Sequence, residues 1–204
     1  MAGPARRSPA LPHSPVSHRP AWFFRAADDW DWWERELLEQ VTTGPVLDLG
    51  AGAGRVALWL QDRGLDVTAV EASPLAAEVC RARGVHDVRL ADLNDPPTDR
   101  AWTAILLLCG NLGLGGSYDG IRQLLRRLAD ISAPDAVLVG DTVDPSGPGD
   151  IRLRIRYRGQ TTNWWRQYNI GTAEIPTLID GTGWTLERHI IDLPDHAVLL
   201  RRDR

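Results

Sequence analysis

The amino-acid sequence predicts an α/β fold, with helices on both faces of a mostly parallel sheet. Two observations predict it. Short apolar runs alternate with amphipathic segments between residues 46 and 140, and a glycine-rich turn directly follows the first run. The chain has 204 residues, which suits one domain of this kind with small additions. Hydrophobic residues make up 43% of the chain, so a sizeable core can be buried.

The N-terminal part divides into two segments of different composition. Residues 1–20 hold five prolines, three arginines and no acidic residue, so we expect a mobile tail. Residues 21–41 carry aromatic and aliphatic side chains at mostly helical spacing. We interpret this second segment as one or two amphipathic helices that form a lid on the domain 21–204.

The middle of the chain alternates between strand and helix. Ser73 and Pro74 supply an N-cap and a first helical residue, and Gly64 ends the helix before them. The expected strands are 46–49, 67–70, 88–91, 104–109 and 136–140, and the expected helices are 55–63, 74–84 and 118–131.

The last third of the chain interrupts this alternation. From residue 151 to residue 158, apolar side chains and tyrosine alternate with arginines at a period of two, and a second aromatic run follows. These features predict an inserted β-hairpin over residues 151–170. A short helix at 174–179 and two antiparallel strands, 184–191 and 197–201, complete the expected fold.

The composition excludes several classes of function. All 23 basic residues are arginines, so no lysine can form a Schiff base with pyridoxal phosphate or hold a phosphate in a P-loop. The net charge of −4 argues against a nucleic-acid substrate, and no apolar stretch is long enough to span a membrane. Cys80, Cys109 and the five histidines lack zinc-site spacing, so we expect no structural metal, reduced thiols and a cytoplasmic location.

The sequence VLDLGAGAGR carries the strongest functional signal. A predicted strand delivers three glycines into a turn that opens a helix, which lets a ligand approach the main chain closely. Arg55 stands where a dinucleotide-binding turn has its third glycine. Asp48, two residues before the first glycine, suits a ligand with a positively charged amino group and would repel a pyrophosphate.

Two further acidic residues follow the next two predicted strands. Glu71 could accept hydrogen bonds from both hydroxyls of a ribose. Asp92 could accept one from an adenine amino group, and the Leu93 amide could donate to a ring nitrogen. Each acid alone is more often a solvated strand-end residue. Together with the glycine turn they indicate a nucleoside site at the carboxyl ends of the strands.

These segments resemble the class I, Rossmann-like S-adenosylmethionine (SAM)-dependent methyltransferases, with DLGAGAG, VEASP and ADL similar to the first three motifs of that family. The resemblance covers residues 46–143. It implies a doubly wound seven-stranded sheet whose last strand runs antiparallel, with SAM as methyl donor and S-adenosylhomocysteine as product. The cofactor-binding residues implied are Asp48, Gly50, Ala51, Gly52, Glu71, Ala72, Asp92, Leu93, Cys109 and Asn111.

The methyl acceptor is less clearly indicated. Residues 107–120 depart from the Asn-Pro-Pro-aromatic pattern of enzymes that methylate amide or base nitrogens. A small-molecule acceptor is expected, under aromatic side chains or beside Asn111; the candidates are Trp22, Trp30, Asn111, Trp164, Trp165 and Tyr168. These aromatic residues could instead simply pack on the sheet. The arginines of residues 152–158 could recognise an acidic acceptor or partner, or form a solvated face.

Catalytic residues and oligomeric state stay unassigned. A strand-end cysteine such as Cys109 is more often a small apolar filler than a nucleophile, and a dedicated base is not required for methyl transfer. Two alternative functions remain at this point. One is a non-catalytic SAM-binding or regulatory module, and the other is a nicotinamide-dependent oxidoreductase, which Asp48 and Arg55 disfavour.

Overall fold

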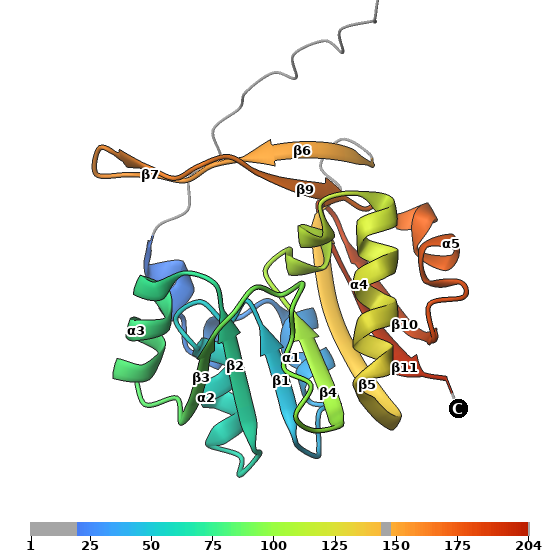
Figure 1. Ribbon diagram of the computed structural model, residues 1–204, viewed down its shortest axis with the longest axis horizontal. Helices are drawn as coiled ribbons and strands as arrows, with labels where there is room; N and C mark the ends of the chain where they lie inside the picture. The colour runs from blue at the N-terminus through green and yellow to red at the C-terminus, as the bar shows by residue number, and fades with distance from the viewer. Residues whose placement is uncertain (1–19, 144–147, 204) are drawn as a thin grey trace, which may run out of the picture.

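The computed structural model describes residues 20–143 and 148–203 of the chain, so the predicted mobile tail lies outside the described residues except for Pro20. A central sheet separates two layers of helices, and a long two-stranded ribbon lies over one end of the sheet (Figure 1).

The central sheet has seven strands in the order β10-β11-β5-β4-β1-β2-β3. Strands β1 to β5 pair in parallel, whereas β11 runs antiparallel to both of its neighbours. The predicted seven-stranded fold with an antiparallel last strand is therefore confirmed. The strands are β1 Val46–Leu49, β2 Val67–Glu71, β3 Asp87–Leu90, β4 Trp102–Leu107, β5 Ser132–Val143, β10 Trp184–Asp192 and β11 Asp195–Arg202.

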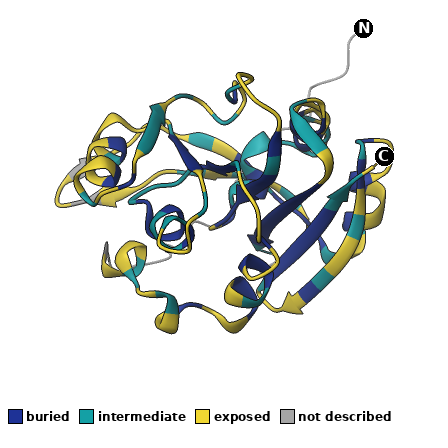
Figure 2. Ribbon diagram, turned by 90° about the horizontal axis from the view of Figure 1, so that it is seen from below, coloured by how far each residue is buried: buried dark blue, intermediate teal, exposed yellow. Residues whose placement is uncertain are grey.

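Apolar side chains on both faces of the sheet are buried, as expected for parallel strands covered by helices. In β1, Val46 faces a cluster that includes residues of α1, α2 and α3, whereas Leu47 faces a cluster built with α4 and α5. The buried residues accordingly concentrate in the central strands (Figure 2). The helices are α1 Trp32–Leu38, α2 Arg55–Gln61, α3 Pro74–Ala82, α4 Tyr118–Asp130 and α5 Ile175–Ile179.

The helix starts follow local capping. The Ser73 hydroxyl accepts a hydrogen bond from the Ala76 amide at 3.4 Å, with Pro74 at the first helical position. The expected strand 104–109 was wrong at its end. Strand β4 stops at Leu107, because Cys109 and Gly110 adopt positive φ angles of 63° and 79°.

The N-terminal segment differs from the one or two amphipathic helices that the spacing predicted. It forms three short pieces, η1 Pro20–Phe24, η2 Ala27–Asp29 and α1, because Ala26 and Trp30 have extended ψ angles of 161° and 160°. Helix α1 belongs to the core, since Leu37 and Leu38 are fully buried.

The predicted hairpin is confirmed as an antiparallel ribbon of β6 Gly149–Leu153 and β9 Trp165–Asn169. Its tip holds the short strands β7 Arg156–Tyr157 and β8 Gln160–Thr161. The ribbon crosses the side of the sheet where the parallel strands end (Figure 1). It packs directly on the short helix η3 Asn111–Gly115, because a Cβ at Gly113 would lie 2.5 Å from the Tyr168 carbonyl oxygen.

Replacing Leu37 with alanine tests whether α1 is part of the cooperative core. The substitution should lower the free energy of unfolding by about 2–5 kcal/mol, because it leaves a cavity in a fully buried cluster. Urea unfolding measures the effect. The control is Leu75→Ala, because Leu75 lies on α3 and is 74% exposed. It should change the free energy of unfolding by less than about 0.5 kcal/mol. Equal effects of the two substitutions would contradict the packing of α1.

Candidate functional site

The glycine turn after β1 is held by backbone bonds to the end of β2. The Gly50 and Ala51 amides both donate to the Val70 carbonyl, at 2.8 and 3.1 Å. Gly50 has a φ of +78°, and a Cβ there would overlap the side-chain amide of Asn111. A Cβ at Gly52 would instead meet no atom within 4 Å. The space beside Gly50 is therefore filled by Asn111, whereas the space beside Gly52 is open to a ligand.

Glu71, at the end of β2, reaches across to this turn. One carboxylate oxygen accepts the Gly52 amide and the other accepts the Ser73 amide, both at 2.8 Å. An ionised carboxylate has about four acceptor positions. Glu71 therefore orders the turn and retains acceptor capacity for further donors.

Asp92 lies beside Glu71 at the end of the neighbouring strand. The Ala91 amide donates to the Glu71 carbonyl at 3.2 Å, which joins the ends of the two strands. One oxygen of Asp92 accepts the backbone and side-chain amides of Asn94, at 2.8 and 2.9 Å. The second carboxylate oxygen accepts no hydrogen bond from the described residues, so it can accept one from a ligand.

Asn111 ties the loop after β4 to the glycine turn. Its side-chain amide donates to the Leu49 carbonyl at 3.0 Å and to the Gly50 carbonyl at 3.2 Å. The structure thus brings together residues from four strand ends that the sequence singled out: Asp48, Gly50, Gly52, Glu71, Asp92 and Asn111.

Asp48 is buried, with 4% of its surface exposed, on the sheet face covered by α1 and α2. Burial raises the pKa of its carboxyl to about 7, although the nearby Arg55 guanidinium opposes the shift. A carboxylate that is costly to ionise in isolation is well placed to pair with a cationic group of a ligand.

Arg55 and Glu34 form a buried ion pair that sequence reasoning missed. Arg55 Nη2 lies 2.5 Å from Glu34 Oε1, and both side chains are less than 10% exposed. The Arg55 guanidinium also lies over the rings of Trp22 and Trp30, at 5.3 and 4.8 Å from their centres. The signal in the sequence was Glu34 itself, an acid three and four residues before the core residues Leu37 and Leu38.

Cys109 differs from the buried apolar filler that was expected. The residue keeps exposed surface, and its thiol accepts a hydrogen bond from Arg55 Nη2 at 3.2 Å. The surrounding protein atoms raise the pKa of the thiol to about 12 by desolvation. At neutral pH the thiol is therefore protonated and a poor nucleophile.

The side chain of Asp141, near the end of β5, forms a hydrogen bond with the loop that follows β4. One of its carboxylate oxygens accepts the Gly110 amide at 2.9 Å. The carboxyl is buried, and burial raises its pKa to about 7. Asp141 therefore helps to hold the backbone of the loop after β4.

The aromatic residues proposed as substrate contacts do not gather at one place. Trp30 is buried against Trp59, and the Tyr168 hydroxyl donates to Glu174 at 2.9 Å. Trp164, just before β9, is 49% exposed and lies under Arg154, whereas Trp165 is the first residue of β9 and pairs with Leu153. Only some of these residues are thus placed to meet an acceptor.

The three described histidines, His86, His189 and His196, lie away from this group of residues. The His189 Nε2 and His196 Nδ1 atoms are 3.0 Å apart, and His196 Nε2 lies 2.8 Å from the Ile170 carbonyl oxygen. His86 contacts the Gln61 side chain. None of these contacts involves a residue of the glycine turn, so they suit structural roles.

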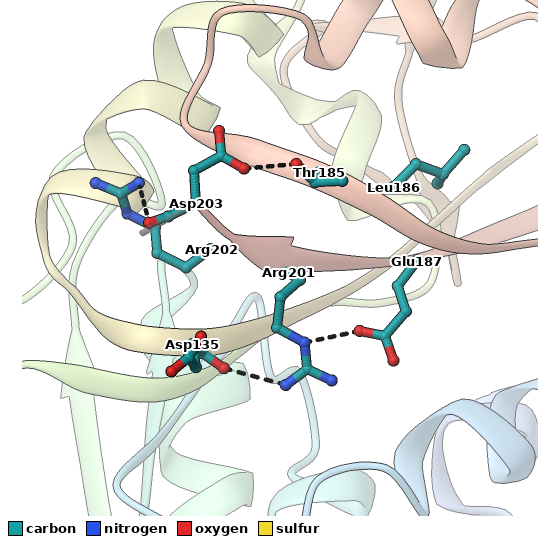
Figure 3. A pocket seen from close by; sticks show the side chains of 7 residues that line it. All are labelled: Asp135, Thr185, Leu186, Glu187, Arg201, Arg202 and Asp203. Carbon is teal, nitrogen blue, oxygen red and sulfur yellow. Dashed lines mark hydrogen bonds and ion pairs between the residues drawn. The ribbon is translucent and has the colours of Figure 1, made fainter.

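A hollow at the other end of the sheet is drawn in Figure 3. It lies where β5 begins and β11 ends. Its charged groups are paired, with Arg201 on Glu187 at 2.7 Å and on the Asp135 carbonyl at 3.1 Å. Ligands of open α/β sheets bind at the carboxyl ends of the strands, so we assign this hollow no function.

Within residues 20–143 and 148–203, no helix is long and apolar enough to cross a membrane. The same ranges hold no group of three histidine, cysteine or acidic residues placed to bind a metal ion.

Comparison with known proteins agrees with the motifs. A family model described as a methyltransferase domain matches residues 46–135. A SAM-dependent methyltransferase from Bacteroides fragilis, solved with S-adenosylhomocysteine, has a TM-score of 0.80 at 25% identity, over 92% of this chain and 83% of that one. The matched domain and the shared fold together indicate a class I SAM-dependent methyltransferase. The chain is therefore an enzyme that uses SAM as cofactor.

Two further solved structures share the fold of this methyltransferase. The CcbJ methyltransferase from Streptomyces caelestis has a TM-score of 0.68 at 17% identity, over 87% of this chain and 94% of that one. The glycopeptide N-methyltransferase MtfA, with S-adenosylhomocysteine, has a TM-score of 0.64 at 15% identity, over 82% and 87%. Among curated proteins, no sequence matches this chain.

The residues of this methyltransferase fit SAM on structural grounds. The open side of the turn at Gly52 leaves space for a ligand against the backbone, and Asp48 offers a buried carboxylate. SAM carries an ammonium group on its methionine part and hydroxyls on its ribose, which these acceptors suit.

The raised pKa of Asp48 predicts how stability depends on pH. Between about 3.9, the value for an unfolded chain, and about 7, the folded protein holds a proton that the unfolded chain has lost. This contribution to stability is therefore full at low pH and is lost as the pH rises through 7. Asp48→Asn should gain stability relative to wild type by up to about 1.4 kcal/mol per pH unit between pH 5 and 7.

Urea unfolding at four pH values between 5 and 8 measures this difference. The exposed Asp130, replaced by asparagine, is the control and should give a curve parallel to that of the wild type. A parallel curve for Asp48→Asn as well would show that Asp48 ionises normally in the folded protein.

Proposed function

We propose that this methyltransferase acts on a small-molecule acceptor with an apolar, planar part, which binds between the strand ends and the inner face of the β6–β9 ribbon. The observation that carries the proposal is the sidedness of this ribbon. We also propose that the enzyme acts in the cytoplasm, where its two free cysteines stay reduced.

The inner face of the ribbon is identified by Gln167. This side chain is buried, and its amide donates to the Gly110 carbonyl at 3.4 Å, in the loop after β4. Ile151 pairs with Gln167 across the ribbon, and Leu153 pairs with Trp165. Because side chains two residues apart share a face, Ile151, Leu153 and Trp165 lie on this same face. They are partly exposed and form an apolar surface on the side of the strand ends.

The arginines of the ribbon occupy the other face. Arg152 pairs with Arg166 across the ribbon, and both are exposed. Arg166 lies 3.5 Å from Asp150, and Arg154 lies over Trp164. This face is turned away from the loop that Gln167 contacts, which favours an apolar over an acidic acceptor and leaves the arginines solvated.

SAM would supply a methyl group activated by its sulfonium: a nucleophilic atom of the acceptor would bond to the methyl carbon while the carbon–sulfur bond breaks and S-adenosylhomocysteine leaves. The chain has to hold the acceptor near the methyl group and exclude water. The rigid strand ends suit the first task, and the apolar face of the ribbon suits the second. A dedicated base is not part of the proposal.

For the cofactor we propose the assignment that the motifs implied. Asp48 faces the methionine part with Gly50, Ala51 and Gly52, and Asp92 and Leu93 face the adenine. Glu71, with Ala72 beside it, faces the ribose, while Cys109 and Asn111 border the methionine part. The spare acceptor positions of Glu71 and Asp92 support this assignment.

Replacing Glu71 with alanine tests the ribose assignment. The variant should bind S-adenosylhomocysteine about 10- to 150-fold more weakly, since one charge-assisted hydrogen bond contributes about 1.5–3 kcal/mol. Asp92→Ala should cost less, because its proposed partner is one neutral amino group. Isothermal titration calorimetry on folded protein gives both values. Wild-type affinity in Glu71→Ala would remove Glu71 from the cofactor site.

The acceptor assignment is tested by turnover. We expect release of S-adenosylhomocysteine from SAM with at least one member of a panel of planar amines and phenols, and none with oligonucleotides. Trp165→Ala should lower kcat/KM for that acceptor by about tenfold, since an aromatic contact and its buried area contribute more than about 1 kcal/mol.

Trp164→Ala is the matched control, because it removes the neighbouring ring from the outer face. It should leave kcat/KM within about twofold, and neither variant should change the affinity for S-adenosylhomocysteine. A larger loss in Trp164→Ala than in Trp165→Ala would place the acceptor on the outer face.

A further inference from the structure

One nitrogen of Arg55 is not used by the contacts described so far. Nη2 donates to Glu34 and to the Cys109 thiol, whereas Nη1 is buried and has no hydrogen-bond partner among the described residues. Leaving a buried charged donor unpaired is costly. The guanidinium therefore has a donor available for an acceptor that the described residues do not supply.

The position of this donor is set on several sides. Arg55 is the first residue of α2, directly after the glycine turn. Glu34 fixes one edge of the guanidinium, and the rings of Trp22 and Trp30 lie over it. The Cys109 sulfur, 3.2 Å from Nη2, belongs to the loop that follows β4. The guanidinium thus lies between two of the loops that border the proposed methionine site.

The charges around Arg55 point to a ligand with both signs of charge. Asp48 and Glu34 are two buried carboxyl groups, and Arg55 interacts with both. A lone anion would leave Asp48 uncompensated, and a lone cation would leave Arg55 Nη1 unpaired. An α-amino acid group supplies an ammonium for the carboxylate and a carboxylate for the guanidinium.

We propose that Arg55 is a cofactor-binding residue, whose Nη1 binds the carboxylate of the methionine part of SAM while Asp48 faces its ammonium group. This inference rests on the proposed cofactor site. The Cys109 thiol is a weak acceptor, so its bond to Nη2 can be exchanged for one to a carboxylate at little cost. The ion pair with Glu34 holds the planar group in place.

The test compares two ligands that differ only in this carboxylate, S-adenosylhomocysteine and its decarboxylated analogue. Wild-type protein should bind the first about 10- to 150-fold more tightly, as one charge-assisted hydrogen bond requires. Calorimetry measures both dissociation constants. Affinities within about threefold of each other overturn the proposal without any variant.

Variants then locate the contact. Arg55→Met is combined with Glu34→Gln, because removing the arginine alone would leave a buried carboxylate unpaired. In this double variant the preference for S-adenosylhomocysteine should fall to within about threefold. Glu34→Gln alone is the matched control and should keep the preference, because the glutamine side-chain oxygen can still accept the hydrogen bond from Arg55 Nη2. A preference that persists in the double variant overturns the assignment of Arg55.

Two further measurements keep the outcome decisive. If the double variant does not fold, Arg55→Lys decides, because lysine keeps the charge but cannot bridge Glu34 and a ligand in the same way. An unchanged preference in Arg55→Lys then overturns the proposal. 5′-Methylthioadenosine, which lacks the amino-acid group, should bind wild type and variants alike. Failure of wild type to bind it would instead indicate that the proposed nucleoside site is wrong.

Discussion

The buried ion pair between Glu34 and Arg55 is the constraint on which the carboxyl end of the sheet depends. Removing two charges from water is costly, so a pair of this kind is retained only where its geometry is good. Here it joins α1 to the first residue of α2. Because the glycine turn leads directly into Arg55, fixing the guanidinium also fixes the end of that turn. The packing of the N-terminal segment and the shape of the turn are therefore coupled.

The other loops at this end are joined to the same turn by hydrogen bonds to backbone groups. Glu71 holds it from β2, and Asn111 holds it from the loop after β4. Asp141 in turn holds Gly110. Side chains that reach across strand ends in this way place acceptors before a ligand arrives, so less ordering is required on binding. The cost is that Asp48 and Asp141 are buried as carboxyls whose pKa values rise to about 7.

Much of the fold follows from patterns that are local in the sequence. Ser73 and Pro74 begin α3 where expected, and the apolar strands alternate with helices in the predicted order. The contact between Glu34 and Arg55 could not be derived in this way, because the partners are 21 residues apart and meet only when α1 packs on the sheet. The prediction for the surroundings of Cys109 was also wrong. The positive φ angles that end β4 early depend on the loop packed against that strand. Tertiary contacts, which periodicity does not encode, decide both features.

The orientation of the ribbon is a further feature that periodicity does not encode, and it bears on the proposed choice of acceptor. The period of two correctly placed the arginines and the apolar residues on opposite faces of the ribbon. It did not indicate which of the two faces is turned toward the strand ends. The side is decided by Gln167, whose buried amide meets Gly110 and so turns Ile151, Leu153 and Trp165 the same way. Residues 149–169 contain five arginines and one acid, a net charge of +4, so the rest of the chain carries a net charge of −8. This charge lies on an exposed face, whereas the cofactor motifs lie on the strands and their ends. On the proposed assignment, substitutions on the ribbon can therefore change the acceptor without disturbing the residues proposed to hold SAM, because the two sets of residues belong to separate elements joined chiefly through η3.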